Sequence, residues 1–254
     1  MKKLAIAALA LSALIAAPAT AAELAVKAPP APYVPPLYSW TGCYLGVHIG
    51  AGTLHADWTD EDFGEGSGIG VAGGFQTGCN YQIRQLVVGV EGEFYWSSIE
   101  AKHDDLTVPG SEFHFSTKNT RDASVALRLG YAFDRLLLYG KVGADWGRLE
   151  WTGSSIFPCD TGTCINQNFA ERTVPGVLLG TGFEYAFLDN WTAKLEYNYI
   201  NFGHPLTTFT QTCSGPGIGP ADCPPFGHTR RDTKQILKVG LNYKFGWGGP
   251  YPAY

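Results

Sequence analysis

The side chains in this chain that are best suited to chemistry are acids and bases that alternate with bulky apolar residues. Glu91 and Glu93, for example, follow Val88 and Val90 in a strict alternation. If the alternation places the charges on one face, they could line an ion path or a pH gate, or they could pair with one another as structural filling. Six acids against five bases favour the paired filling, because a buried unpaired charge costs several kcal/mol. The acids are Glu91, Glu93, Asp122, Asp145, Glu184 and Glu196, and the bases are Arg128, Lys141, Lys194, Lys238 and Lys244.

Nucleophiles and metal-ligating residues are present, but they lack the spacing that catalysis or metal binding requires. Ser97 and Ser98 have no histidine in their stretch, so the sequence predicts that the protein is not an enzyme. The histidines that could ligate haem iron are not paired, and they are His55, His103, His114, His204 and His228. An acidic segment without the spacing of an EF-hand contains Asp57, Asp60, Glu61, Asp62 and Glu65. We expect this segment to be a solvated loop rather than a calcium site, and we expect no metal and no cofactor.

The composition excludes several classes of protein. Glycine accounts for 32 of 254 residues, aromatic residues for 13% and charged residues for only 16%. The aromatic content excludes a disordered chain, and the glycine and tyrosine content excludes a coiled coil. A formal net charge of −5 offers no basic surface for nucleic acid. An all-β protein rich in tight turns fits this composition.

The first residues indicate export. A basic start at Met1-Lys2-Lys3 precedes an apolar run from Leu4 to Ala17, and Ala19-Thr20-Ala21 has the small-x-small pattern of a cleavage site. We expect residues 1–21 to be a cleaved signal peptide rather than an anchor, because the run is short for a span of about 20 residues. Prolines dominate residues 22–38, which we interpret as a periplasmic linker, with docking to a periplasmic or cell-wall partner as the alternative.

From Trp40 onward, apolar and polar residues alternate with the two-residue period of β-strands that have one apolar face. Eight such segments lie in residues 39–245, with aromatic residues at their ends as in the interfacial girdles of a lipid-facing wall. The connections alternate between short (82–85, 134–135, 188–190) and long (53–67, 98–118, 150–172, 203–232). Strands in lipid must leave no unpaired edge. The predicted fold is therefore an eight-stranded antiparallel up-and-down transmembrane β-barrel with short periplasmic turns and four long extracellular loops. Pro175 is expected at the rim, where the third long loop enters the sixth strand.

Several motifs resemble those of a known family. The stretch Ser39-Trp40-Thr41-Gly42-Cys43-Tyr44-Leu45-Gly46 resembles the SWTGFYxG opening of small alphaproteobacterial outer-membrane β-barrels, the outer-membrane immunogenic or porin-family proteins. Segments 88–93, 128–132, 182–186 and 191–197 resemble the same family. The resemblance covers roughly residues 39–245, and it implies a barrel in the outer membrane of a Gram-negative bacterium with antigenic loops at the surface.

The end of the barrel segment resembles the outer-membrane assembly signal. Lys238, Gly240, Tyr243 and Phe245 have its polar, glycine, aromatic and aromatic spacing. The resemblance implies the barrel assembly machinery as a partner. The family usually stops at the last aromatic residue, whereas this chain continues through residues 246–254, which we expect to form a flexible periplasmic tail.

Six cysteines in an exported chain predict disulfide bonds, although fifteen complete pairings are possible. Cys159 and Cys164 flank a short turn, and Cys213 and Cys223 flank a Pro- and Gly-rich stretch, which leaves Cys43 and Cys79. The last two occupy outward positions near the periplasmic ends of the first two strands. The resembled family usually has aromatic residues at both positions, so the two departures fit one added bond. Zinc binding is the alternative.

These features predict a structural, surface-exposed outer-membrane protein that contributes to envelope integrity and offers its loops for antigenic or other contacts. The alternatives are a small-solute porin, a haemin-binding surface protein or a soluble periplasmic β domain. The expected partners are outer-membrane lipids and lipopolysaccharide, the assembly machinery, and a host or cell-surface ligand at the loops. No nucleic acid is expected, and we expect a monomer.

Overall fold

The computed structural model describes residues 37–57, 65–105, 112–159, 162–215, 226–229 and 231–245. The secondary structure of these residues consists of strands. They are β1 (Gly42–Asp57), β2 (Glu65–Ile83), β3 (Leu86–Asp105), β4 (Glu112–Phe133), β5 (Leu136–Cys159), β6 (Gly162–Ala186), β7 (Trp191–Asn201), β8 (Leu206–Ser214), β9 (Phe226–Thr229) and β10 (Arg231–Phe245). The predicted signal peptide (1–21), all but the end of the linker (22–38) and the C-terminal extension (246–254) lie outside the described residues. No described helix is long and apolar enough to cross a membrane.

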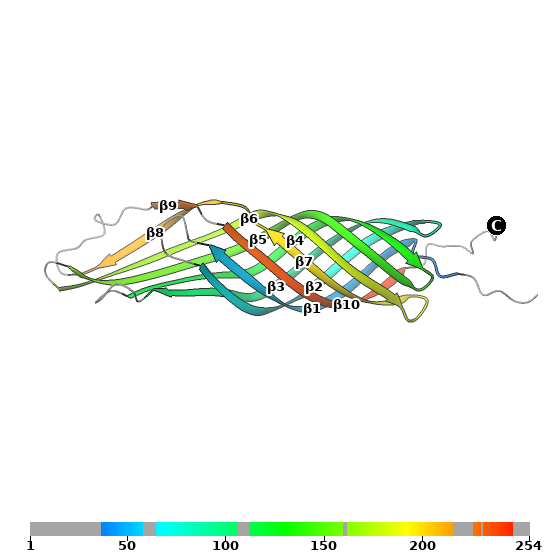
Figure 1. Cartoon of the computed structure of the whole chain (residues 1–254), viewed down its shortest axis with the longest axis horizontal. Helices are drawn as coiled ribbons and strands as arrows, with labels where there is room; N and C mark the ends of the chain where they lie inside the picture. The colour runs from blue at the N-terminus through cyan, green and yellow to red at the C-terminus, as the bar shows by residue number, and fades with distance from the viewer. Residues whose placement is uncertain are drawn as a thin grey trace, which may run out of the picture. The chain divides into compact units, whose positions relative to one another are not determined.

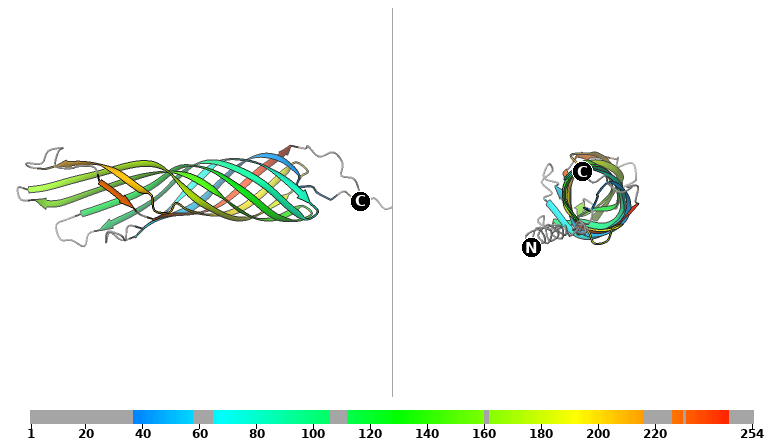
Figure 2. Two further views of the ribbon diagram at one scale, coloured as in Figure 1. Left: turned by 90° about the horizontal axis from the view of Figure 1, so that it is seen from above. Right: turned by 90° about the vertical axis from the view of Figure 1, so that its right-hand side faces the viewer.

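Eight of the described strands form a closed antiparallel ring (Figures 1 and 2). Neighbouring strands from β1 to β7 pair in chain order, β10 pairs with β7, and the pairing of β1 with β10 closes the ring. β8 and β9 do not belong to it, because β8 pairs with the distal part of β6, from Ile165 to Phe169, and β9 pairs with β8. The predicted all-β, up-and-down barrel is confirmed.

Alternation along each strand determines which side chains face out. On β1, Leu45, Val47 and Ile49 are more than half exposed, while the residues between them are buried or intermediate. The other ring strands repeat this pattern with Val125, Leu127, Val177, Leu179, Leu237 and Val239, among others. A soluble monomer rarely exposes so large a continuous apolar surface, so this wall faces lipid.

Aromatic side chains border the apolar wall on both sides. Tyr131 and Phe133 lie at its periplasmic edge, with ring centroids 4.8 Å apart, and Phe94 and Trp96 lie at its distal edge, 5.0 Å apart. On β4 the wall runs from Phe133 to Ala123, eleven residues along a tilted strand, which corresponds to an apolar band of about 25 Å. That height matches the hydrocarbon core of an outer membrane.

The strands continue well beyond the distal edge of this wall. β5 and β6 remain paired as far as Cys159 and Gly162, so most of the connection predicted at 150–172 is strand. The segments predicted as loops at 53–67 and 98–118 are likewise largely strand. Register shifts occur between Trp96 and Ile99 and between Asn119 and Arg121, at the level where the strands leave the apolar wall.

Pro175 lies within β6, opposite Trp146, and not at the start of the strand as expected. The last rung between β6 and β7 is the pair Val177 and Asn201. The edge of β6 at Pro175 therefore has no ladder partner on that side, and a residue without an N–H is tolerated there.

Candidate functional site: the filled interior of the barrel

Most of the predicted ionisable residues meet inside the periplasmic half of the barrel. We call this group the charged cluster, and its side chains come from six different strands. Each of its residues is at most 6% exposed. Its members are Glu91 and Glu93 on β3, Arg128 on β4, Lys141 on β5, Glu184 on β6, Lys194 and Glu196 on β7, and Lys238 on β10.

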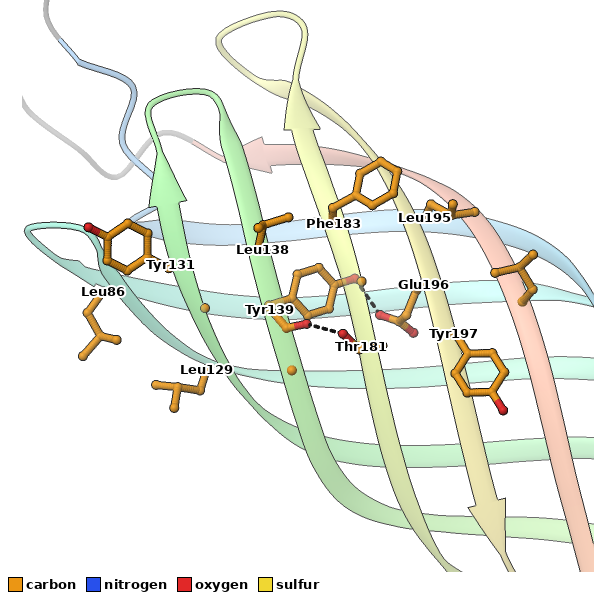
Figure 3. Close-up of a pocket in the computed structure, with 14 residues that line it drawn as sticks. Leu86, Leu129, Tyr131, Leu138, Tyr139, Thr181, Phe183, Leu195, Glu196 and Tyr197 are labelled. Atoms are coloured by element: carbon orange, nitrogen blue, oxygen red, sulfur yellow. Dashed lines mark hydrogen bonds between the residues drawn. The ribbon is translucent and has the colours of Figure 1, made fainter.

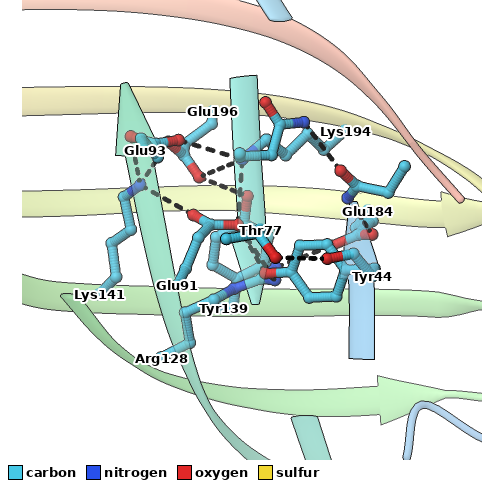
Figure 4. A network of polar contacts seen from close by, with 12 residues as sticks. Tyr44, Thr77, Glu91, Glu93, Arg128, Tyr139, Lys141, Glu184, Lys194 and Glu196 are labelled. Carbon is cyan, nitrogen blue, oxygen red and sulfur yellow. Dashed lines mark hydrogen bonds and ion pairs between the residues drawn. The ribbon is translucent and has the colours of Figure 1, made fainter. Parts of the chain in front are cut away.

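Three carboxylates and three ammonium groups form the centre of the charged cluster. Figure 4 shows Glu91, Glu93, Glu196, Lys141 and Lys194 of this group. The Nζ atom of Lys238 lies 2.7 Å from Glu93 and 3.0 Å from Glu196. Lys141 reaches the same two carboxylates at 3.3 and 2.7 Å. Lys194 lies between 3.2 and 3.4 Å from all three acids, Glu91 included. Every charge has at least two opposite neighbours, so charges in a buried site are compensated.

Arg128 connects Glu91, at the centre of the charged cluster, to Tyr44 on β1 and Glu184 on β6. Its guanidinium donates to Glu184 at 2.8 Å and to the hydroxyl of Tyr44 at 2.6 Å. Tyr44 in turn donates to Glu91 at 2.6 Å, and the guanidinium stacks over the ring of Tyr139, 3.9 Å from its centroid. These aromatic residues hold the guanidinium in one orientation.

Close-packed residues of the wall separate this interior from the lipid. Figure 3 shows Leu129, Leu138 and Phe183 on the outer side of the strands. These three residues help to line a hollow of about 720 Å³. The hydroxyl of Tyr139 donates to Glu196 at 2.8 Å. Each strand therefore presents an apolar face to the lipid and a charged face to the lumen within a few residues.

The acids of the charged cluster could in principle hold a metal ion. Oxygens of Glu91, Glu93 and Glu196 all lie within 4.8 Å of one another. The ammonium groups of Lys141 and Lys194 each contact all three carboxylates. These positively charged groups already supply the charge that a cation would bring, so the arrangement does not favour a metal.

Three predicted members of the network lie outside the charged cluster. Asp122 pairs with Lys234, a buried lysine that the sequence analysis did not single out. Lys234 lies four residues before Lys238 on the same face of β10, so the alternation contained the signal for it. Asp145 is fully buried, and neither carboxylate oxygen has a hydrogen-bond partner among the described residues. Lys244 lies at the periplasmic rim, where its ammonium contacts the carbonyl of Ser39.

Apolar side chains fill the distal half of the barrel interior. We call this group the apolar cluster. None of its members is more than 8% exposed, and Leu149, Leu178 and Ile200 are completely buried. It comprises Ala126, Leu149, Trp151, Ala170, Val174, Leu178, Ile200, Phe202 and Phe209, and a second buried group nearby contains Leu54, Ala56, Ile99 and Ala101. The charged inward face expected from the alternation therefore occupies the periplasmic half, whereas apolar side chains predominate in the distal half.

The residues before β1 close the periplasmic mouth. Trp40 is 1% exposed and packs in one cluster with Tyr38, Val87 and Leu137. Its indole N–H donates to the carbonyl of Asp134 at 3.0 Å, and its backbone N–H donates to Gln82 at 2.7 Å. Residues 37–41 thus form a plug anchored to the short turns on that side.

The predicted bond between Cys43 and Cys79 is confirmed, and it joins directly opposite residues of β1 and β2. Cys164 and Cys213 are also disulfide-bonded. The side chains of Cys159 and Cys223 lie outside the described residues, so the two predicted loop pairings remain predictions.

The candidate haem ligands and nucleophiles are not assembled into a site by the described residues. His55 is exposed on β1, His204 lies 3.3 Å from Arg231, and the side chain of His228 lies outside the described residues. Ser97 and Ser98 belong to the bulge of β3, where Ser97 accepts the N–H of Ile99 and Ser98 donates to Val71. The acidic segment has its described ends, Asp57 and Glu65, opposite one another, and residues 60–62 lie outside the described residues.

The parts of β3, β4, β5 and β6 that continue beyond the apolar wall form what we call the distal sheet. His114 takes part in an exposed polar group on this sheet. Its Nδ1 atom donates to Asp104 at 2.7 Å, and its Nε2 atom lies 3.9 Å from Glu112. The hydrogen bond to Asp104, aided by the charges of both acids, raises the pKa of His114 above its ordinary value. His103 is half-buried and opposite Phe115 on the neighbouring strand.

The four residues of the predicted assembly signal lie on β10, the strand whose pairing with β1 closes the ring. Tyr243 and Phe245 face outward, with ring centroids 5.3 Å apart, and Tyr243 packs on Trp191 at 5.2 Å. Lys238 faces the charged cluster. Gly240 lies where a β-carbon would come within 3.0 Å of the Gln76 side chain, so a larger residue would displace it.

Comparison with known proteins gives a consistent result. Residues 6–245 match the family described as "Outer membrane protein beta-barrel domain". The chain is similar to the 31 kDa outer-membrane immunogenic protein of Brucella melitensis, with 34% identity over 251 residues that cover 92% of this chain and 97% of the relative. It is similar to the 22 kDa outer membrane protein of Rhizobium leguminosarum, with 34% identity over 66% of this chain and 67% of the relative. A solved major outer membrane protein of Thermus thermophilus covers 80% of this chain and 99% of its own, with a TM-score of 0.45 and 15% identity.

Proposed function

This chain belongs to the outer membrane protein beta-barrel family, and from that premise we propose that it is a sealed, structural barrel that supports envelope integrity and displays an interaction surface outside the cell. It is an outer-membrane protein with a disulfide-linked wall. The finer role rests on what fills the barrel and on what projects from it.

The observation that carries this proposal is the continuous filling of the interior. Trp40 occupies the periplasmic mouth, the charged cluster occupies the proximal half, and the apolar cluster occupies the distal half. Water and ions would have to cross a region where packed apolar side chains leave only a few buried polar groups among the described residues, such as Thr117, Asn119 and Asp232, to replace their hydration. This filling supports a barrel that contributes mechanical stability rather than transport.

A planar-bilayer recording of the refolded, heat-modifiable protein tests this proposal directly. We expect an electrically silent barrel. Discrete conductance steps that change in size when Lys141 is replaced by glutamine would overturn the proposal and support the small-solute porin instead. Loss of heat modifiability in Lys141→Gln would mean that the variant is unfolded, so conductance of the natural chain is read first.

Envelope integrity requires a second experiment in cells. A strain that lacks the protein is expected to become more sensitive to detergent and to large hydrophobic antibiotics, and the natural chain is expected to restore resistance. Complementation by a form shortened between Glu100 and Lys118 and between Glu150 and Glu171, two cross-strand pairs beyond the wall, would separate the barrel from its distal sheet. Unchanged sensitivity of the deletion strain would contradict a role in envelope integrity.

The distal sheet supports the second half of the proposal. β3, β4, β5 and β6 continue beyond the apolar wall and present polar residues outward, as in the cross-strand row Lys102, Ser116 and Thr152. A rigid sheet of this kind offers a surface for antibody or host contacts. Haemin receives less support, because no described histidine belongs to a group of three or more potential metal ligands.

Insertion by the barrel assembly machinery and a monomeric state are further parts of the proposal. The single ring closed by β1 and β10 supports a monomer, because no described strand of the ring leaves an open edge within the apolar wall.

A further inference from the structure

Each ring strand has a position where its outward face changes from apolar to polar at the distal edge of the wall. We call these the boundary positions. They are Thr53 on β1, Ser67 on β2, Ser98 on β3, Arg121 on β4, Arg148 on β5, Thr173 on β6, Asn201 on β7 and Gln235 on β10. Among these described residues, only Arg121 and Arg148 carry a charge.

The two charged boundary positions are direct neighbours. Arg121 and Arg148 are cross-strand partners, which places their β-carbons about 5 Å apart on the same face. Like charges placed directly opposite one another repel and destabilise a sheet. The register shift just before Arg121 brings this arginine into the pairing, so local strand geometry holds the two cations together.

The acids nearby do not compensate both arginines. Arg148 forms an ion pair with Glu171 through its Nε and Nη2 atoms, and its side chain remains 34% exposed. Arg121 is exposed and forms no ion pair with another described residue. Two guanidinium groups and one carboxylate leave a net positive charge at this place on the wall.

The surroundings restrict the kind of anion that would bind. Trp96 is the cross-strand neighbour of Arg121 on β3, and Trp146 lies two residues before Arg148 on β5. Both tryptophans are exposed, at 54% and 44%, and they mark the interface between hydrocarbon and headgroups. An anion at the arginine pair that also covers these rings must carry apolar groups, and acyl chains are the apolar groups that a membrane supplies at this level.

We infer that Arg121 and Arg148 bind a phosphate group of the phosphorylated glycolipid in the outer leaflet, with its acyl chains packed over Trp96 and Trp146. Guanidinium groups match phosphate oxygens in paired hydrogen bonds, and a shared phosphate relieves the repulsion between the two arginines. The inference needs only the barrel and its place in the outer membrane, so it stands whether or not the barrel conducts.

Binding of lipopolysaccharide to the refolded full-length protein in detergent micelles tests this inference. The probes are purified lipopolysaccharide, the same material with its lipid A phosphates removed, and inorganic phosphate. We expect the phosphorylated glycolipid to bind at least tenfold more tightly than the dephosphorylated form, and inorganic phosphate to bind too weakly to compete. Equal binding of the two glycolipids would overturn the inference.

Paired variants locate the site on the protein. Arg121→Gln combined with Arg148→Gln is expected to weaken binding of the phosphorylated glycolipid at least fivefold. Arg135→Gln is the matched control, because Arg135 is an exposed arginine at the periplasmic end, paired with Asp189 at 2.8 Å, and its loss should leave binding unchanged. Heat modifiability verifies that each variant is folded. Equal loss in both variants would mean a non-specific charge effect and would contradict the site.

Discussion

The two halves of the barrel interior obey opposite rules. In the periplasmic half the inward residues are charged, as at Lys141, and the outward residues are apolar, as at Val142. In the distal half the inward residues are apolar, as at Trp151, and the outward residues are polar, as at Thr152. The same strands carry both patterns. The solvent outside decides the polarity, because lipid surrounds the first half and water surrounds the second.

The reversal takes place at a buried polar layer. Asp122 and Lys234 pair there, and Asn119 donates to Asp122 at 3.2 Å. Asp145 on β5 lies opposite Ser124, two residues from Asp122 on β4. Beyond this layer most buried side chains are apolar, as in the core of a soluble β protein, although Thr117 and Asp232 are also buried there. The two halves should therefore respond differently to changes in charge and in volume.

Removal of one acid from the charged cluster is expected to have the largest effect. Glu93→Gln leaves Lys141, Lys194 and Lys238 short of one anion in a buried site, which should lower the free energy of unfolding by about 3–5 kcal/mol. Urea unfolding in lipid vesicles, followed by tryptophan fluorescence, measures the change. Glu112→Gln on the exposed sheet is the control and should alter stability by less than about 0.5 kcal/mol. An equally mild effect of Glu93→Gln would mean that its charge is not needed for compensation.

Loss of volume should have the next largest effect, and in the other half. Leu149→Ala opens a cavity in the apolar cluster and should cost about 3 kcal/mol of unfolding free energy. Because no charge is involved, the loss should be the same in low and high salt, in the same urea assay. Thr152→Ala, on the outward face three residues away, should be close to neutral. A loss of stability in Leu149→Ala that depends on salt would contradict a distal half that is stabilised by apolar packing alone.

The disulfide lies on the wall of the charged half and should contribute less. Replacement of Cys43 and Cys79 by serine removes a crosslink between residues 36 apart in sequence and should cost about 2 kcal/mol. The cost should disappear when the natural chain is compared with the variant under reducing conditions. A persistent difference there would mean that the serines disturb the lipid-facing wall itself.

Titration of the distal sheet should give the smallest effect. The hydrogen bond to Asp104 raises the pKa of His114, so its stabilising contribution is complete below the ordinary histidine value and is lost as the pH rises through the raised value. In Asp104→Asn, the pKa of His114 measured by NMR should fall toward its ordinary value. An unchanged pKa would show that Asp104 is not its partner in solution.

The ring could be predicted from the sequence because one alternation runs through all eight segments. The same reasoning placed Glu91, Lys141 and Lys194 inside, and their mutual contacts followed from closure of the ring. The length of the strands could not be predicted. On β5, the apolar residues shift from even positions such as Val142 to odd positions such as Leu149. This change of phase reads as the end of a strand, whereas it marks the passage from lipid to water.

The plug at the periplasmic mouth could not be predicted either. Trp40 was visible as part of a motif, but its burial depends on Asp134, in the turn after β4, and on Gln82, near the end of β2, both distant in the sequence. Local patterns do not contain such pairings. The arginine pair was missed for a similar reason, since it needs the register between β4 and β5.

The contact between Lys244 and Ser39 joins two residues that are 205 positions apart in the sequence, near the beginning and the end of the barrel segment. β1 can meet β10 only after the last residues of the barrel have been synthesised and delivered, so closure is a late, high-contact-order event. Ser39, the residue before Trp40 in the plug, can reach its contact with Lys244 only after that step. A probe of the contact between Ser39 and Lys244 should therefore report completed insertion and give no signal while only the earlier hairpins are in the membrane.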